Sequence, residues 1–216
     1  MEHKMISIAD QVFERLEMDI LSGVFERDDM LTESKLSEQL GVSRTPIREA
    51  VRRLNQEHLV ELTSKGIKVV GINRQDIADI SEIRLRLEGL AARWAAERAN
   101  EEDIRALREI VELQEFYTAK ADADSIKNQD SRFHQTIYSL CGSNAMRDTL
   151  EPLHRKLLKY RRVSVSAKSR AQLSLAEHRA ICEAIAAHNG EEAERLTIEH
   201  VQNARESILK MRTAER

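Results

Sequence analysis

Histidines recur inside otherwise apolar stripes at three separate places in this 216-residue chain. His134 follows Asp130 by four residues, so the two side chains lie one above the other if this stretch is helical. His178 and His200 interrupt two further apolar stripes that have helical spacing. The three stripes consist of Ile126, Asp130, His134, Ile137 and Cys141; of Leu175, His178, Cys182 and Ile185; and of Leu196, His200, Ala204 and Ile208. A divalent metal ion would satisfy this buried carboxylate and these imidazoles together. A single histidine on an apolar face is more often a satisfied core residue, so spacing alone leaves both interpretations open.

Arg84 also falls in an apolar stripe, which has Ile80, Leu87, Ala91 and Trp94 at spacings of four and three. The other polar residues are less constrained by their spacing. His154 could line a cavity near the three histidines or be exposed, and His188 is expected at a helix end. Arg161 and Arg162 are predicted to be solvated.

The elements that must position these residues are predicted to be helices. They cover Gln75–Arg98, Glu101–Thr118, Ala123–Cys141, Ala145–Ser164, Leu175–His188 and Glu191–Met211, with a capping box formed by Ser174 and Glu177 before the fifth. We expect an all-α bundle of six or seven helices over 73–216. The boundary with the preceding domain, 1–72, is expected near Gly71–Asn73.

The composition agrees with a mainly α fold, because seven Gly and two Pro are few breakers for this length. No apolar stretch approaches the roughly 18 residues of a membrane span, and no secretion signal is recognisable. Cys141 and Cys182 sit in apolar patterns, which favours reduced core thiols and a cytoplasmic protein.

The first 73 residues predict a winged helix-turn-helix. Three helices are expected, over Met5–Gly23, from Thr32 to Leu40 and from Ser43 to Glu57, and Thr32 and Ser43 are expected to cap the second and third. Two strands are expected after them, over Val60–Leu62 and Ile67–Val70. Gly41 supplies the turn between the second and third helices, so the third can lie in the major groove of DNA. The exposed start of that helix carries Ser43, Arg44, Thr45 and Arg48. Arginine can pair with guanine through two hydrogen bonds, whereas hydroxyls suit phosphate oxygens.

Net charge does not by itself indicate a nucleic-acid-binding protein. The whole chain carries −3, and residues 1–73 hold 10 basic and 13 acidic side chains. Four arginines, Arg44, Arg48, Arg52 and Arg53, face a single acid, Glu49, over ten residues. On charge alone, a solvated helix face explains that run better than a DNA contact does.

The stretch Leu31–Ala50, with Gly-Val-Ser-Arg-Thr-Pro-Ile-Arg-Glu-Ala at its end, closely resembles the winged-helix signature of GntR-family bacterial transcriptional regulators. The resemblance implies that Arg44, Thr45 and Arg48 contact operator DNA, and that Gly66, beside Lys65 at the wing tip, approaches the minor groove. Ser34 stands where the family usually has a DNA-contacting Arg, and His58 replaces a usual Gly. The operator contacts of this chain are therefore expected to differ from the family's usual set.

The remainder of the chain resembles the all-helical FCD-type effector domain of the FadR-like subgroup. The resemblance is carried by Ile83-Arg84 with Leu87-Glu88, Asp130 with Phe133-His134, Gly142-Ser143-Asn144, Glu177 to Ile181, and His200. It implies a divalent metal, zinc first with nickel or manganese as alternatives, held by Asp130, His134, His178 and His200. It further implies a small organic-acid effector bound by Arg84 and Asn144.

The sequence thus predicts a metabolite-responsive, sequence-specific transcriptional regulator that acts as a homodimer. It leaves open whether this regulator is a repressor or an activator. An effector at the metal would alter operator affinity. One alternative is a metal-dependent hydrolase or lyase that uses the same ligands. Another is an architectural DNA-binding dimer that has no ligand.

Overall fold

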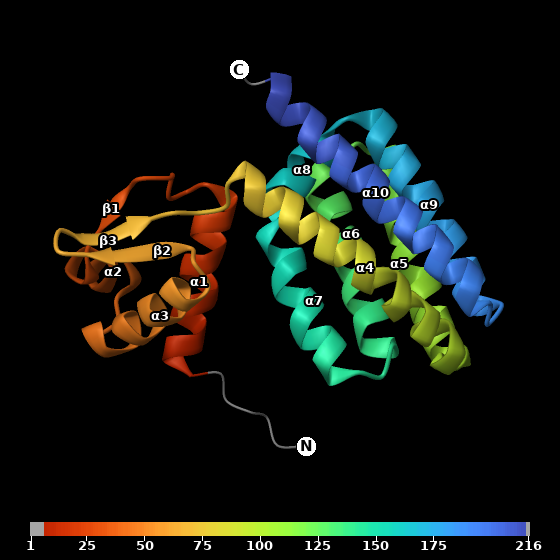
Figure 1. Cartoon of the computed structure of the whole chain (residues 1–216), viewed down its shortest axis with the longest axis horizontal. Helices are drawn as coiled ribbons and strands as arrows, with labels where there is room; N and C mark the ends of the chain where they lie inside the picture. The colour runs from red at the N-terminus through yellow and green to blue at the C-terminus, as the bar shows by residue number, and fades with distance from the viewer. Residues whose placement is uncertain (1–6, 215–216) are drawn as a thin grey trace. The chain divides into compact units, whose positions relative to one another are not determined.

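The computed structural model describes residues 7–214, without the side chains of Lys159, Arg162 and residues 211–214. The chain separates into two units, one ending at Asn73 and one starting at Arg74. Within the described residues, a small sheet lies with three helices in the first unit, and the second unit is entirely helical (Figure 1). The predicted fold class, a winged helix-turn-helix followed by an all-α bundle, is confirmed.

Each helix of the first unit begins at a residue suited to a cap. The helices are α1 (Ile8–Ser22), α2 (Glu33–Leu40) and α3 (Arg44–Gln56). Ser7 and Asp10 form a capping box at the start of α1, and Thr32 accepts a hydrogen bond from the Lys35 amide at the start of α2. Ser43 occupies the cap position of α3, but its side chain makes no capping hydrogen bond, so the prediction that it caps this helix is wrong in that respect.

The sheet of the first unit has the strand order β1-β3-β2, with both pairs antiparallel. Its strands are β1 (Met30–Leu31), β2 (Val60–Thr63) and β3 (Gly66–Val69). The β2–β3 hairpin confirms the predicted wing. Strand β1 was not predicted, because two residues are too short to show an alternating pattern. The sheet and helices share a core that includes Leu16, Leu36, Ile47, Leu54, Leu59 and Val69.

Gly66 is required where β1 meets the hairpin. Its φ is +134°, and a Cβ built there would lie 2.7 Å from the Leu31 carbonyl oxygen. Gly66→Ala is therefore expected to lower the free energy of unfolding by about 1–3 kcal/mol, measured by urea unfolding of the full chain. Gly71→Ala is the matched control, because Gly71 also has a positive φ, +62°, but no atom lies within 4 Å of the place that a Cβ would occupy there. Equal losses in the two variants would contradict the predicted clash with Leu31.

The second unit contains seven helices among its described residues. They are α4 (Arg74–Arg98), α5 (Glu101–Ala119), α6 (Ala123–Leu140), α7 (Asn144–Lys156), α8 (Leu158–Ser166), α9 (Lys168–Ala186) and α10 (Gly190–Ala214). The predicted fourth helix, Ala145–Ser164, is in fact two helices that meet at Leu157. Helix α9 starts at Lys168, seven residues before its predicted start at Leu175, so Ser174 lies buried inside it. The predicted capping box of Ser174 and Glu177 is wrong for that reason.

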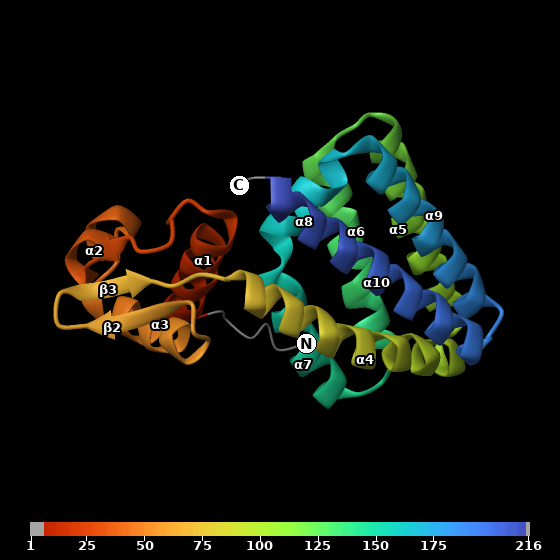
Figure 2. The same ribbon diagram turned by 45° about the horizontal axis from the view of Figure 1, so that its top comes forward.

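Helices α4 and α10 lie side by side, as both views of the ribbon show (Figures 1 and 2). Gly89 on α4 allows the approach, since a Cβ there would come within 2.8 Å of the Ile198 side chain. The apolar core includes both cysteines, which are unpaired and buried. Burial raises the pKa of the Cys182 thiol to about 11, so this thiol is protonated at neutral pH. No helix in the described part of the chain is long and apolar enough to span a membrane.

Candidate metal centre and nucleic-acid interface

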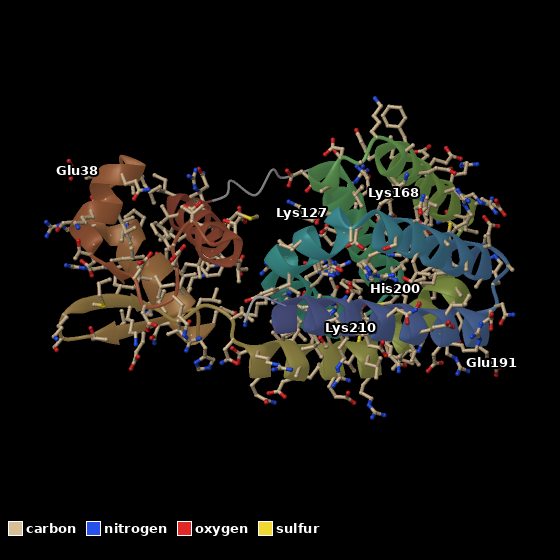
Figure 3. The ribbon with its side chains drawn as sticks, turned by 90° about the horizontal axis from the view of Figure 1, so that it is seen from above. Glu38, Lys127, Lys168, Glu191, His200 and Lys210 are labelled. Carbon is tan, nitrogen blue, oxygen red and sulfur yellow. The ribbon has the colours of Figure 1, made fainter. Side chains whose placement is uncertain are left out.

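The four predicted metal ligands converge in the interior of the bundle. Asp130 and His134 come from α6, His178 comes from α9 and His200 from α10, and all four are at most 2% exposed. One potential ligand atom from each residue lies within 4.8 Å of the others. The Nε2 atom of His200 is 3.2 Å from Nε2 of His134 and 3.3 Å from Nε2 of His178. Figure 3 shows His200 among the helices of the bundle.

A second set of polar groups fixes the orientation of each imidazole. The Nδ1 atom of His134 lies 3.1 Å from the Glu88 carboxylate, and that of His178 lies 2.7 Å from the Gln114 amide oxygen. In the same way, Nδ1 of His200 lies 2.7 Å from the Glu177 carboxylate. All three partner atoms are hydrogen-bond acceptors, which favours the tautomer with the proton on Nδ1 and a lone pair on Nε2.

Three lone pairs and one carboxylate oxygen therefore face a common point. Burial lowers the pKa of His134, His178 and His200, so the imidazoles are neutral at pH 7. In this tautomer the three Nε2 atoms carry no proton, so they cannot donate hydrogen bonds to one another. Oδ1 of Asp130, which lies 3.6 Å from Nε2 of His178, is a fourth acceptor. A cation at the common point satisfies all four groups, and nitrogen and oxygen donors in this number suit a divalent transition metal. The residues fit the predicted metal.

Arg161 of α8 is part of this site, contrary to the prediction that it is solvated. It is 5% exposed, and its guanidinium forms an ion pair with Oδ2 of Asp130. Although burial would raise the pKa of Asp130, Arg161 and the nearby histidines outweigh that effect and hold it below its usual range. The same guanidinium lies 2.9 Å from Nδ1 of His154, which is buried. Of the two positions considered for His154, the structure therefore shows the interior one.

Arg84 lies on α4, one turn before Glu88, and both side chains are buried as an ion pair. Tyr138 donates a hydrogen bond to Oε1 of the same glutamate at 2.7 Å. Burial alone would raise the pKa of Glu88, but Arg84 and His134 hold it well below its usual value. The Nη2 atom of Arg84 is buried and has no hydrogen-bond partner among the described atoms. This arginine thus keeps one donor group for a further molecule.

Glu88, His134 and His154 form a second group with metal-ligand spacing. A second metal ion does not fit there. Arg84 and Tyr138 hold Oε1 of Glu88, and the Arg161 guanidinium lies against both ring nitrogens of His154. A dication would be placed beside two buried arginines, with strong repulsion.

Several residues of the site were missed by sequence reasoning. Arg170 and Asn203 both bind the Glu177 carboxylate, at 2.9 and 2.8 Å. A role for Arg170 could not be inferred, because this residue fell in a predicted loop, where no helical spacing assigns it to a face. Gln114 could have been found, since Ile104, Leu107, Val111 and Gln114 repeat at helical spacing in the same way as the histidine stripes.

Asn144 is not brought to this cluster. It is the first residue of α7, is exposed, and lies ten residues beyond His134, past the end of α6. Its amide does not take part in the site as the structure describes it.

Most of the predicted DNA-reading residues are exposed on the first unit. Ser43, Arg44, Thr45 and Arg48 are exposed at the start of α3, whose opposite face buries Ile47, Ala50, Val51 and Leu54. Lys65 is exposed in the turn of the hairpin, next to Gly66. Arg48 forms an ion pair of 2.8 Å with Glu33 on α2. This arginine must exchange Glu33 for DNA before it can contact a base or a phosphate.

Replacing Glu33 with Gln is accordingly expected to strengthen DNA binding about 1.4- to fivefold, because exposed ion pairs are worth ~0.2–1 kcal/mol. Fluorescence anisotropy with a labelled duplex at constant salt measures the change. Glu38→Gln is the matched control: Glu38 is exposed on the same helix (Figure 3), and the substitution removes the same charge. An equal gain in both variants would show that only net charge matters.

Comparison with known proteins identifies relatives for both units. The family model described as "Bacterial regulatory proteins, gntR family" matches residues 8–69, and that of the FCD domain matches residues 79–203. The chain is 28% identical over 193 residues to the uncharacterized HTH-type transcriptional regulator YdhC of Bacillus subtilis (strain 168), covering 88% of this chain and 86% of the relative. It is 26% identical over 206 residues to the HTH-type transcriptional repressor RspR of Escherichia coli (strain K12), covering 95% and 90%. Over 122 residues it is 34% identical to the gluconate operon transcriptional repressor of Bacillus licheniformis, covering 56% and 50%.

Among solved structures, E. coli McbR/YncC has the same fold. Its TM-score is 0.83 at 23% sequence identity, and the match covers 96% of this chain and all of that one.

Proposed function

The chain belongs to the GntR family of transcriptional regulators and carries an FCD effector-binding domain, and from this premise we propose that it is a metal-dependent, metabolite-responsive repressor. The proposal assigns operator binding to 1–72, and effector binding and dimerisation to 73–216. The observation that carries it is the convergence of three Nε2 lone pairs and the Asp130 carboxylate on one point. Each imidazole has a separate acceptor beside its Nδ1, as metal-binding histidines commonly do.

The proposed metal is zinc, with nickel or manganese as alternatives, held by Asp130, His134, His178 and His200. Such an ion supplies Lewis acidity and open coordination positions for an anionic ligand. Glu88, Gln114 and Glu177 keep the imidazoles in the required tautomer, and Arg161 keeps Asp130 ionised.

The proposed effector is a small organic acid. Arg84 supports this assignment, because its unpartnered Nη2 is a buried, charged donor suited to a carboxylate oxygen. Two relatives are named repressors, one of them of a gluconate operon, which favours repression over activation here.

On the DNA side, we propose that Ser43, Arg44, Thr45 and Arg48 contact the major groove and that Lys65 and Gly66 contact the minor groove. A homodimer is proposed because one recognition helix reads only a few base pairs, while a two-fold pair reads half-sites ~34 Å apart. A DNA-binding regulator of this kind acts in the cytoplasm.

Elemental analysis of the purified protein, combined with a thermal-shift screen of small organic acids, tests the proposal. We expect about one divalent metal ion per chain, stabilisation by a subset of acids, and release of operator DNA by the same acids. Arg84→Gln should abolish the stabilisation and leave metal content unchanged. Protein that folds, binds operator DNA and contains no metal would support the architectural alternative instead.

A further inference from the structure

Six buried or nearly buried charges surround the candidate metal ligands, and they pair one to one. Arg84 pairs with Glu88, Arg161 pairs with Asp130, and Arg170 pairs with Glu177. The three arginines are 2%, 5% and 9% exposed, and the side chain of Glu177, the most exposed of the carboxylates, is 11% exposed. With neutral imidazoles and a neutral Tyr138, the described groups of this cluster carry no net charge.

A divalent ion bound to Asp130 and the three histidines therefore brings two positive charges that the described side chains of the cluster do not neutralise. The only carboxylate among its proposed ligands, Asp130, is already paired with Arg161. Unbalanced charge is strongly unfavourable in a low-dielectric interior. A bound molecule with two negative charges would balance them.

A place suited to anionic groups lies next to two of the proposed ligands. A cavity of about 10 Å³ is lined by Asp130 and His200 together with Arg161, Arg170, Ser164 and Ser174. Arginine and serine side chains are donors suited to carboxylate oxygens. The cavity holds about one water molecule, so it must widen to admit an organic acid, and α8 carries Arg161 and Ser164 of its lining. Helix α8 is joined to its neighbours at Leu157 and Ala167, and neither of its ends is capped by a side chain.

We infer that the effector of this chain is a dianion, a small aliphatic dicarboxylate, and that the Arg161–Arg170 cavity recognises it. The inference rests on the proposed function and adds to it the charge of the ligand and a recognition site in addition to Arg84. Removing one arginine charge by Arg170→Gln should then move the preference toward a ligand with a single negative charge.

Isothermal titration calorimetry of zinc-saturated protein at pH 7 tests this with three molecules of similar length: succinate, its monoamide succinamate, and butyrate. We expect succinate to bind at least about tenfold more tightly than either monoanion. In Arg170→Gln the ratio should fall several-fold, whereas Arg105→Gln, which removes an exposed charge from α5, should leave it unchanged. Zinc content measured before and after each titration shows whether the acid has removed the metal.

Two results would overturn the inference in distinguishable ways. Succinamate or butyrate binding as tightly as succinate would refute the dianion and leave the proposed organic-acid regulator intact. Failure of all three acids, and of malonate and glutarate, to bind zinc-loaded protein would refute the dianion and the proposed effector site together.

Discussion

His178→Ala should purify with little or no divalent metal. His178 is fully buried, and its Nε2 faces His200 and Asp130. We expect the metal affinity to fall by more than about 100-fold, beyond the roughly 10–100-fold effect of losing an outer-shell partner. Elemental analysis after dialysis against a competing chelator measures this.

Gln114→Ala provides a graded comparison, because Gln114 only accepts the Nδ1 hydrogen bond of His178. Its effect should lie within the outer-shell range of about 10–100-fold. His58→Gln, at an exposed residue of the first unit, is the control and should retain full metal content. Circular dichroism confirms that each variant is folded. A folded His178→Ala protein with undiminished metal content would remove this residue from the site.

Arg44→Ala should weaken operator binding about 5–150-fold, which corresponds to ~1–3 kcal/mol for an arginine that pairs with a guanine edge. Arg44 is the first residue of α3 and is exposed. The measurement is fluorescence anisotropy, at fixed salt, with a duplex selected from a random pool by the wild-type protein. Arg105→Ala on α5 removes an exposed charge outside the DNA-reading face and is the control.

The comparison with a scrambled duplex separates two roles of Arg44. A base contact requires that Arg44→Ala lose affinity for the selected operator and much less for the scrambled sequence. Equal losses on both duplexes would mean that the residue only contacts phosphates, and the assignment of base reading to Arg44 would be wrong.

The convergence of the proposed metal ligands could be predicted from sequence because each lies in a long helix with a regular apolar stripe. Asp130 and His134 are one turn apart, and His178 and His200 each interrupt such a stripe. The period of a helix fixes which residues share a face, and burial of polar residues on that face is then unusual enough to be informative.

The part of the site around α8 could not be predicted. No Gly or Pro marks the breaks at Leu157 and Ala167, so Arg161 fell at the end of a predicted helix and Arg170 in a loop. Their ion pairs with Asp130 and Glu177 depend on how α8 and α9 pack onto α6 and α10, which no local pattern encodes. Strand β1 was missed because it has only two residues, and the Arg48–Glu33 pair was missed because it joins two different helices.

Helix α4 begins at Arg74, directly after the last residue of the first unit, and carries Glu88 against His134 fourteen residues later. At 1.5 Å per residue, Glu88 lies ~21 Å along the helix axis from Arg74. A rigid helix of that length converts a tilt of about 5° at Glu88 into a displacement of ~2 Å at Arg74. A rearrangement around His134 that tilts α4 by this amount and keeps Glu88 beside His134 would therefore still move Arg74, the residue that follows the winged helix.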